Sequence, residues 1–239
     1  MLFSAHHVSK CYLAGMPGCS ATARVLSRVS LQLDAGSVVG VAGSRACGKT
    51  TLVRCVAGLA RPAAGAIQWA AEARRPRVIA LAPAALPFET VHDVLVRACA
   101  DPLVDHDQLA ELLAVLALDG LLARSQVALT TDERARLALA IGLAVHHPLL
   151  LLDGTADAIA ARARAAVRHC LQRHAAGGRA VLLTGRDAES VGVLASTVLH
   201  LRDGRLVSPA DLEVLAPPAR VAERMPSSGS PPPPPPPPP

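Results

Sequence analysis

The 239-residue sequence has few aromatic residues, few lysines and no long apolar run. Although 51% of its residues are hydrophobic, no uninterrupted apolar stretch reaches the roughly 18 residues that a membrane-spanning helix needs. The most apolar stretch, residues 137–152, is broken by His146, His147 and Pro148. The N-terminus also lacks the charged-then-apolar pattern of a secretory signal. We therefore expect a cytoplasmic protein, long enough for one substantial α/β domain or two small ones.

Paired cysteines are missing as well. The six cysteines include no C-x-x-C pair, so neither a zinc site nor a disulfide framework is indicated. Most of them are expected to be small buried apolar residues. Cys47 differs from the others because it lies inside the glycine-rich motif described below, where a thiol could be reactive.

The positive charge of the chain is carried almost entirely by arginine. The formal net charge is +5, and Lys10 and Lys49 are the two lysines. Aromatic residues make up 2% of the chain, so it lacks the stacking platforms that single-stranded nucleic acids require. We therefore interpret the arginines as solvated surface residues and expect no nucleic-acid partner.

One glycine-rich stretch carries most of the chemistry in the sequence. A β-branched run at 38–41 is followed by a loop and then by an apolar helical pattern, with the loop spelled Gly43-Ser44-Arg45-Ala46-Cys47-Gly48-Lys49-Thr50-Thr51. This is G-x-x-x-x-G-K-[ST] in the strand–loop–helix setting that the motif requires. Backbone N–H groups and the helix N-terminus would face an anionic phosphate chain. Lys49 can reach the β- and γ-phosphates, and the Thr50 hydroxyl can ligate Mg²⁺. We therefore predict that residues 43–51, called the phosphate loop below, bind a nucleoside triphosphate.

Hydrophobic periodicity predicts the elements around this loop. Alternating or apolar runs predict strands at 5–10, 25–33, 38–41, 66–69, 78–81, 149–153, 180–184 and 197–201. Helical spacing predicts helices at 50–59, 90–99, 106–122, 133–146, 160–175 and 211–215. Thr131 or Asp132 is the expected N-cap of the helix at 133–146. From Pro217 the composition is rich in proline, so residues 217–239 are predicted to form a disordered tail.

Strands that alternate with helices around a phosphate loop indicate a mostly parallel sheet with right-handed crossovers. We expect an α/β P-loop NTPase fold in which residues 1–216 form one nucleotide-binding domain. Two additions to the central sheet are expected: an antiparallel β-subdomain at the N-terminus and a helical subdomain at about 88–146.

The order of these pieces resembles the ATP-binding cassette ATPases, the nucleotide-binding subunits of ABC transporters. The resemblance runs from about Leu2 to Leu215. Besides the phosphate loop, which continues in family style to Pro62, it rests on Ser9–Tyr12, Leu149–Asp153 and Leu201–Val207.

The resemblance implies roles for two residues outside the phosphate loop. Tyr12 lies where the family places the aromatic residue that stacks on adenine, although a strand-edge tyrosine without a ligand is the alternative. Asp153 lies where the Walker B aspartate supports Mg²⁺, although a carboxylate at a strand end can also cap the next segment. The implied ligands are ATP and Mg²⁺. The implied partners are a second ABC subunit, identical or different, and a transmembrane permease that holds the chain at the inner face of the membrane.

Several positions depart from the family pattern. Gly154 stands where the family has its catalytic glutamate, and Gly185 stands where it has the switch histidine. The Q-loop glutamine expected near residues 82–84 is absent, and Ala46 replaces the middle glycine of the loop.

The signature L-S-G-G-Q of the family reads Leu129-Thr130-Thr131-Asp132-Glu133 in this chain. Thr131 and Asp132 therefore replace the two glycines that would cover the γ-phosphate bound to the opposite subunit. Carboxylates at Asp132 and Glu133 would lie near an anionic ligand, which disfavours closure of a dimer.

These departures keep the residues that hold a nucleotide and remove those that move a proton. Losing a positioned base alone reduces a rate by about 10²–10⁴, so we expect ATP binding with slow or absent hydrolysis by the isolated chain. Three alternatives stay open. The chain could be a non-hydrolysing nucleotide sensor or scaffold, an ATPase whose base is Asp157 or Asp187, or a P-loop kinase, which would need a substrate-binding lid.

Overall fold

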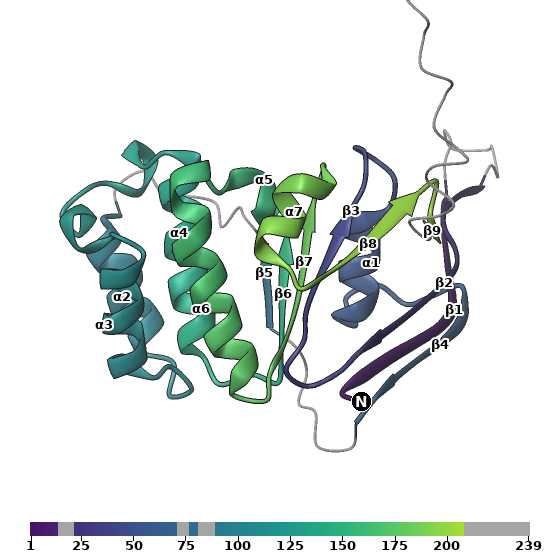
Figure 1. Cartoon of the computed structure of the whole chain (residues 1–239), viewed down its shortest axis with the longest axis horizontal. Helices are drawn as coiled ribbons and strands as arrows, with labels where there is room; N and C mark the ends of the chain where they lie inside the picture. The colour runs from purple at the N-terminus through teal and green to yellow at the C-terminus, as the bar shows by residue number, and fades with distance from the viewer. Residues whose placement is uncertain (14–21, 71–76, 81–88, 208–239) are drawn as a thin grey trace, which may run out of the picture.

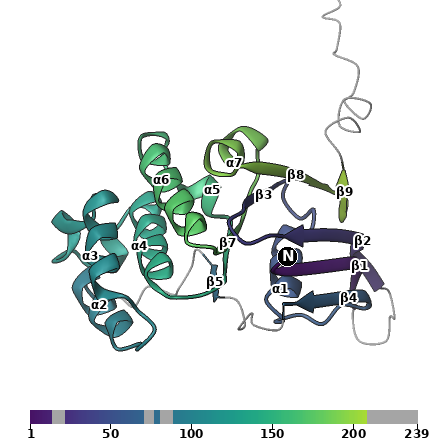
Figure 2. The same ribbon diagram turned by 60° about the horizontal axis from the view of Figure 1, so that its bottom comes forward.

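The computed structural model describes residues 1–13, 22–70, 77–80 and 89–207, arranged as two β-sheets and a set of helices (Figure 1). A three-stranded antiparallel sheet, seen side by side in Figure 2, has the order β2-β1-β4. Its strands are β1 (Phe3–Leu13), β2 (Thr22–Leu33) and β4 (Ala64–Trp69). The rings of Phe3 and Trp69, which are paired residues of β1 and β4, meet edge to face at 4.7 Å. The predicted antiparallel β-subdomain is confirmed, with strands longer than predicted.

The central sheet has six strands in the order β5-β6-β7-β3-β8-β9. All neighbouring pairs are parallel except β8 with β9, so the prediction of a mostly parallel sheet is confirmed. The strands are β3 (Val38–Ala42), β5 (Arg77–Ala80), β6 (Leu149–Asp153), β7 (Ala180–Gly185), β8 (Thr197–Arg202) and β9 (Arg205–Val207). β3 and β7 are buried along their whole length, which is why their sequences are nearly continuous apolar runs.

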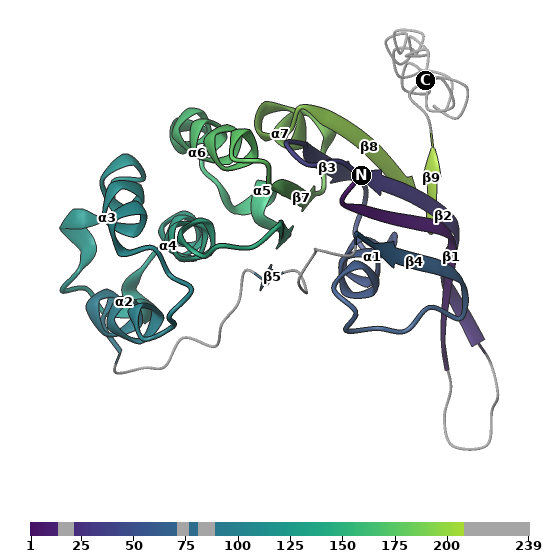
Figure 3. The ribbon, with the colours of Figure 1, turned by 90° about the horizontal axis from the view of Figure 1, so that it is seen from below.

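Helices cover both faces of the central sheet, as the view from below shows (Figure 3). The α-helices are α1 (Lys49–Val56), α2 (Val91–Cys99), α3 (His106–Val115), α4 (Thr131–Ala144), α5 (Thr155–Ala158), α6 (Arg164–Ala176) and α7 (Ala188–Leu194). Short 3₁₀ turns lie at Asp119–Leu121, Gln126–Ala128 and Ala161–Ala163. α1 packs on one face together with the antiparallel sheet, while α4, α6 and α7 cover the other face and α2 and α3 lie beyond α4.

Two apolar cores follow from the alternation of side chains along the central strands. Leu150 and Leu152 of β6 belong to the core that includes α4 and α6. Leu149 and Leu151 belong to the core that contains α1 and the antiparallel sheet. Because both faces of β6 are covered, every one of these leucines is buried, and Asp153 at the strand end is partly buried.

The helices differ from the predictions at several boundaries. The helix predicted at 106–122 ends at Val115, because Ala117 takes a left-handed φ of 51° and the chain then forms a 3₁₀ turn. The predicted N-cap of α4 is wrong: Thr130, rather than Thr131 or Asp132, caps the helix. The Thr130 hydroxyl accepts from Glu133 N, and the Glu133 carboxylate accepts from Thr130 N at 2.7 Å. The spacing T-x-x-E at residues 130–133 is the sequence pattern that predicts such a capping box.

Parts of the predictions lie outside the described residues: the expected Q-loop position at 82–84, the helix at 211–215 and the tail at 217–239. Helices α2 to α4 fall within the predicted helical subdomain at about 88–146, whose exact bounds stay a prediction. Within the described ranges, none of the helices combines the length and apolarity needed to span a bilayer.

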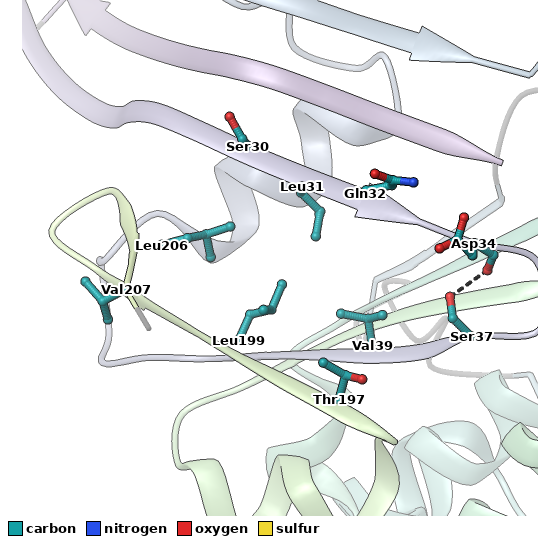
Figure 4. A pocket seen from close by; sticks show the side chains of 10 residues that line it. All are labelled: Ser30, Leu31, Gln32, Asp34, Ser37, Val39, Thr197, Leu199, Leu206 and Val207. Atoms are coloured by element: carbon teal, nitrogen blue, oxygen red, sulfur yellow. Dashed lines mark hydrogen bonds between the residues drawn. The ribbon is translucent and has the colours of Figure 1, made fainter. Parts of the chain in front are cut away.

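A groove of about 470 Å³ runs between β2 and the β8–β9 edge of the central sheet (Figure 4). Leu31, Leu199 and Leu206 line it, and Ser37 at one end donates a hydrogen bond to Asp34 O. Ser37 precedes β3, whereas the phosphate loop follows β3. The groove is therefore separate from the predicted nucleotide site.

Candidate functional site

The phosphate loop leaves β3 at the carboxyl edge of the central sheet, where open α/β sheets bind their ligands. Gly43 N donates to Gly185 O at 3.2 Å, so the start of the loop is tied to the end of β7. Gly204 N donates to Cys47 O at 3.1 Å, which ties the middle of the loop to the β8–β9 turn. The loop is thus held from two sides by the sheet that carries it.

Gly43 and Gly48 are required by close backbone approach. A Cβ on Gly43 would lie 2.3 Å from Leu201 O, and a Cβ on Gly48 would lie 2.8 Å from Val25 O. Gly48 also has φ 110°, which L side chains rarely adopt. No side chain could occupy either position without moving a neighbouring strand.

Within the described residues, no side chain caps the N-terminus of α1. Its N-cap is Gly48, which provides no side-chain hydrogen bond, and the first turn contains no acidic residue. The N–H groups of Lys49, Thr50 and Thr51 therefore have no intrahelical acceptor, and they add to the positive end of the helix dipole. Thr50 is exposed, so its hydroxyl is accessible. This arrangement fits an anionic ligand such as the phosphates of a nucleotide.

Lys49 lies across the loop. Its Nζ donates to Gly43 O at 2.5 Å and to Ser44 O at 2.7 Å, and it lies 3.7 Å from Cys47 Sγ. Cys47 is 6% exposed, so its thiol faces the protein rather than solvent. The ammonium therefore has carbonyl partners within the loop that a phosphate can replace.

Ala46 is the strained residue of the loop. Its φ of 60° is left-handed, in the region where an L residue is disfavoured by about 1–2 kcal/mol. The sequence comparison with the family motif identified this position as a lost glycine, and the backbone shows why a glycine suits it. Ser44, Arg45 and Ala46 are all exposed.

Tyr12 lies on β1, at the end of the antiparallel sheet that approaches the loop. Its neighbour Lys10 pairs with Leu26 in the β1–β2 register, and Leu26 Cδ2 lies 2.9 Å from a Cβ built on Gly48. Tyr12 is 38% exposed, and Lys10 Nζ lies 5.1 Å from its ring centroid, a cation–π distance. Tyr12 is thus an accessible aromatic ring on the strand that flanks the loop.

Asp153 ends β6 and is linked to β7 through Thr184. Thr184 Oγ1 donates to Asp153 Oδ1 at 2.9 Å and accepts from Gly154 N at 2.7 Å. Gly154 then takes a left-handed φ of 72° and starts the short helix α5. A glutamate at 154 would have to adopt the same unfavourable conformation.

The space beside Gly185 is filled by the protein itself. A Cβ on this residue would lie 2.6 Å from Val191 Cγ2 of α7 and 2.9 Å from Ala156 Cβ of α5. A histidine side chain at 185 therefore cannot fit unless α5 or α7 moves. The backbone conformation at Gly154 and the packing around Gly185 therefore both favour glycine.

Both substitute bases considered from the sequence already have partners. Asp157 accepts from Arg186 N at 2.7 Å and pairs with Arg186 Nε at 3.1 Å. Asp187 caps α7 by accepting from Ser190 N, and this hydrogen bond holds the pKa of Asp187 below its ordinary value. Engaged carboxylates of this kind are poor proton acceptors.

The N-terminal turn of α4 is closed by its own carboxylates. Glu133 belongs to the capping box with Thr130, and the Thr130 backbone N–H lowers the pKa of Glu133. Asp132 is buried and bonds Arg136 Nε at 3.0 Å and Ala160 N at 2.8 Å. Arg136 in turn donates to Leu116 O at the end of α3. Thr131 is exposed at the first helical position.

Comparison with known proteins decides the family. The family model for ABC transporters matches residues 26–156, more than half of the chain and a span that includes both the phosphate loop and Asp153. The chain belongs to the ABC transporter family. It is 34% identical to the aliphatic sulfonates import ATP-binding protein of Mesorhizobium japonicum, over 84% of this chain and 77% of that one.

Other ABC relatives are named for the import of different compounds. The chain is 32% identical to the sulfate/thiosulfate import ATP-binding protein of Bordetella parapertussis, over 84% of this chain and 60% of that protein. It is 30% identical to the hemin import ATP-binding protein of Streptomyces coelicolor, over 77% and 71% of the two chains.

Solved ABC structures confirm the predicted fold class. One is the ATP-binding subunit of an ABC transporter, with 19% identity, a TM-score of 0.70, and coverage of 90% of this chain and 92% of that chain. Another is a dimeric ATP-binding cassette in a post-hydrolysis state with ADP and Pi, with 17% identity, a TM-score of 0.70, and coverage of 87% and 97%.

Three contacts at and near the candidate site were not predicted from the sequence. Thr184 donates a hydrogen bond to Asp153 and so links the ends of β7 and β6. Arg186 forms an ion pair with Asp157, and Arg136 forms an ion pair with Asp132. A polar residue that ends an otherwise apolar strand was the available signal for Thr184. The pairing of Asp132 also reduces the charge repulsion expected there from the sequence, because a guanidinium lies 2.9 Å from the carboxylate.

Proposed function

We propose that this chain is the ATP-binding subunit of an ABC import system and that it binds ATP with Mg²⁺ at the phosphate loop. One observation carries the proposal: the uncapped N-terminus of α1, with the Gly43–Gly48 cradle in front of it and Lys49 beside it. Such a helix end is suited to phosphate. The relatives described above are named as import proteins with different cargoes, so they support the class of system without indicating the cargo.

The residues of the loop divide the work of holding the nucleotide. The N–H groups at 48–51 and the Lys49 ammonium bind phosphate oxygens. Tyr12 offers a ring for the adenine to stack on. Thr50 and Asp153 are the residues that would hold Mg²⁺, which when bound neutralises charge on the phosphates.

Hydrolysis by the isolated chain is proposed to be slow or absent. Gly154 and Gly185 supply no side chain to position a water or to take its proton, and the packing around Gly185 leaves no room for one. Asp157 and Asp187 are engaged elsewhere. The loss of a positioned base alone is worth about 10²–10⁴ in rate.

The partners follow from the family rather than from this chain alone. We propose a second ABC subunit, because an ABC cassette resembling this fold forms a dimer. We also propose a transmembrane permease that places the chain at the inner face of the membrane. A competent partner subunit would supply the catalytic residues that this chain lacks in one of the two shared sites.

The test measures ATP affinity with Mg²⁺ and phosphate release under the same conditions. Wild type is compared with Lys49→Ala, and Arg54→Ala serves as the matched control because it removes a positive charge from the last turn of the same helix. We expect binding that depends on Lys49 and not on Arg54, with no phosphate release. Lys49-dependent turnover would show that a replacement base exists, with Asp157→Asn as the next variant. Absence of ATP binding would refute the proposal.

The second candidate function is a nucleotide sensor that works without a permease. The tight packing around Gly185 favours this candidate over a subunit that hydrolyses ATP to drive transport. The two are separated by affinity capture of the full chain from membranes of cells that express it. Recovery of a membrane permease supports the transporter subunit, and ATP binding without any permease supports the sensor.

A further inference from the structure

Thr184 is the most enclosed polar residue at the candidate site. It is 0% exposed and sits one position before Gly185, at the end of β7. Its Oγ1 meets two groups of the neighbouring strand end, the Asp153 carboxylate at 2.9 Å and the Gly154 N–H at 2.7 Å. Both contacts join residues about thirty positions apart, so they exist only because β6 and β7 are paired.

The direction of these two hydrogen bonds is determined by chemistry. A backbone N–H can only donate, so the hydroxyl oxygen must accept from Gly154. The single hydroxyl proton is then directed to Asp153 Oδ1. A hydrogen bond to an ionised carboxylate is stronger than one between neutral groups, and at this partly buried position it restricts rotation of the Asp153 side chain. Among the described residues, Thr184 is the one hydrogen-bond partner of the Asp153 side chain.

We propose that Thr184 is a positioning residue for Mg²⁺ binding: it holds one oxygen of Asp153 and leaves the other for the metal. The same hydroxyl fixes the left-handed turn at Gly154 that follows the carboxylate. This inference rests on the proposed function, because it assigns a role to Asp153 with ATP–Mg²⁺. Outer partners that orient metal ligands typically change metal affinity about 10–100-fold when they are removed.

The experiment measures ATP affinity of the full chain in Mg²⁺ and in EDTA, and takes the ratio of the two. Thr184→Val removes the hydroxyl at nearly constant shape, and Thr184→Ser keeps it. Thr155→Val is the matched control, because Thr155 is also a buried threonine beside Gly154 but its hydroxyl has no hydrogen-bond partner within the described residues. Should Thr184→Val not fold, Thr184→Ala removes the same hydroxyl without adding a methyl beside the Gly154 N–H.

We expect Thr184→Val to reduce the Mg²⁺ enhancement of ATP affinity about 10–100-fold, with the affinity in EDTA unchanged. Thr184→Ser and Thr155→Val should keep most of the enhancement, and Asp153→Asn should lose it. In the Asp153→Asn background, Thr184→Val should add nothing, since it acts through that carboxylate.

Three results would overturn the positioning role. The first is full Mg²⁺ enhancement in Thr184→Val when Asp153→Asn has lost it. The second is an equal loss in Thr184→Ser, or an equal loss of affinity in EDTA, because either indicates a general structural defect. The third is a wild type that binds ATP through Lys49 without any effect of Mg²⁺, which refutes this inference and leaves nucleotide binding intact. A wild type that does not bind ATP at all refutes the proposed function itself.

Discussion

The phosphate loop and the strand ends beside it differ in whether their polar groups have partners within the chain. At the loop, the N-cap residue Gly48 offers the first N–H groups of α1 no side-chain cap, and Lys49 contacts two loop carbonyls and Cys47 Sγ. At the neighbouring β6–β7 edge, which comprises residues 153–157 and 184–187, carboxylates are paired within the chain. Gly185 is covered by side chains of two helices.

This difference bears on the proposal that the chain binds ATP without hydrolysing it. Unsatisfied donors at a helix end are tolerated when an anion satisfies them. Carboxylates that accept hydrogen bonds, and a strand end without space, provide neither a base nor room for one. The N-terminal end of α4 resembles the β6–β7 edge, because the carboxylates of Asp132 and Glu133 also accept hydrogen bonds within the chain. The difference supports the proposal that the chain holds a phosphate chain and cleaves it slowly or not at all.

The largest effect on stability is expected from the buried ion pair between Asp132 and Arg136 at the N-terminal end of α4. Arg136→Leu leaves the buried Asp132 carboxylate with the more distant and largely exposed Arg162 guanidinium at 3.8 Å, so it should reduce the free energy of unfolding by up to about 3–5 kcal/mol. Urea unfolding measures it. Arg173→Leu, which breaks the exposed pair with Glu111, is the control and should change stability much less. The double variant Asp132→Leu/Arg136→Leu should recover part of the loss. Equal stability of Arg136→Leu and wild type would show that this pair does not hold α4.

A histidine introduced at the closed edge tests the packing directly. Gly185→His forces a side chain against Val191 and Ala156, so we expect a loss of about 1–3 kcal/mol in stability. We also expect no gain in phosphate release. Gly192→Ala is the matched control on α7, because its Cβ would meet only Val198 at 3.7 Å. Thermal unfolding and a phosphate assay report the two results. Turnover regained without loss of stability would contradict the closed-edge interpretation.

The smallest effect on stability is expected at Ala46, the residue of the phosphate loop with a left-handed backbone and a side chain. Ala46→Gly relieves a left-handed backbone, and after the entropy of glycine is subtracted it should stabilise the chain by up to about 1 kcal/mol. Ala114→Gly, in the regular helix α3, should do the opposite by about the same amount. Denaturant midpoints of the two variants measure the sign. Destabilisation by both glycines would mean that Ala46 is not strained in solution.

Much of the fold could be predicted because long patterns with one period define it. The run Leu149–Asp153 was placed correctly to the residue, and the alternating N-terminal strands were recognised. Helices α5 and α7 were missed because four and seven residues are too few to show a helical period. The early end of α3 depends on the left-handed Ala117, a conformation that its residue type does not announce.

At the site, the sequence by itself determined the phosphate loop and the absence of a glutamate at 154 and a histidine at 185. These are local facts, since a loop of this spacing forms its cradle from adjacent residues. Only the tertiary structure decided what surrounds those glycines and which groups share Thr184. Its partners Asp153 and Gly154 lie about thirty residues away and meet it through the pairing of β6 with β7. Contacts between strands depend on sheet order and register, and neither is encoded in any single segment of the chain.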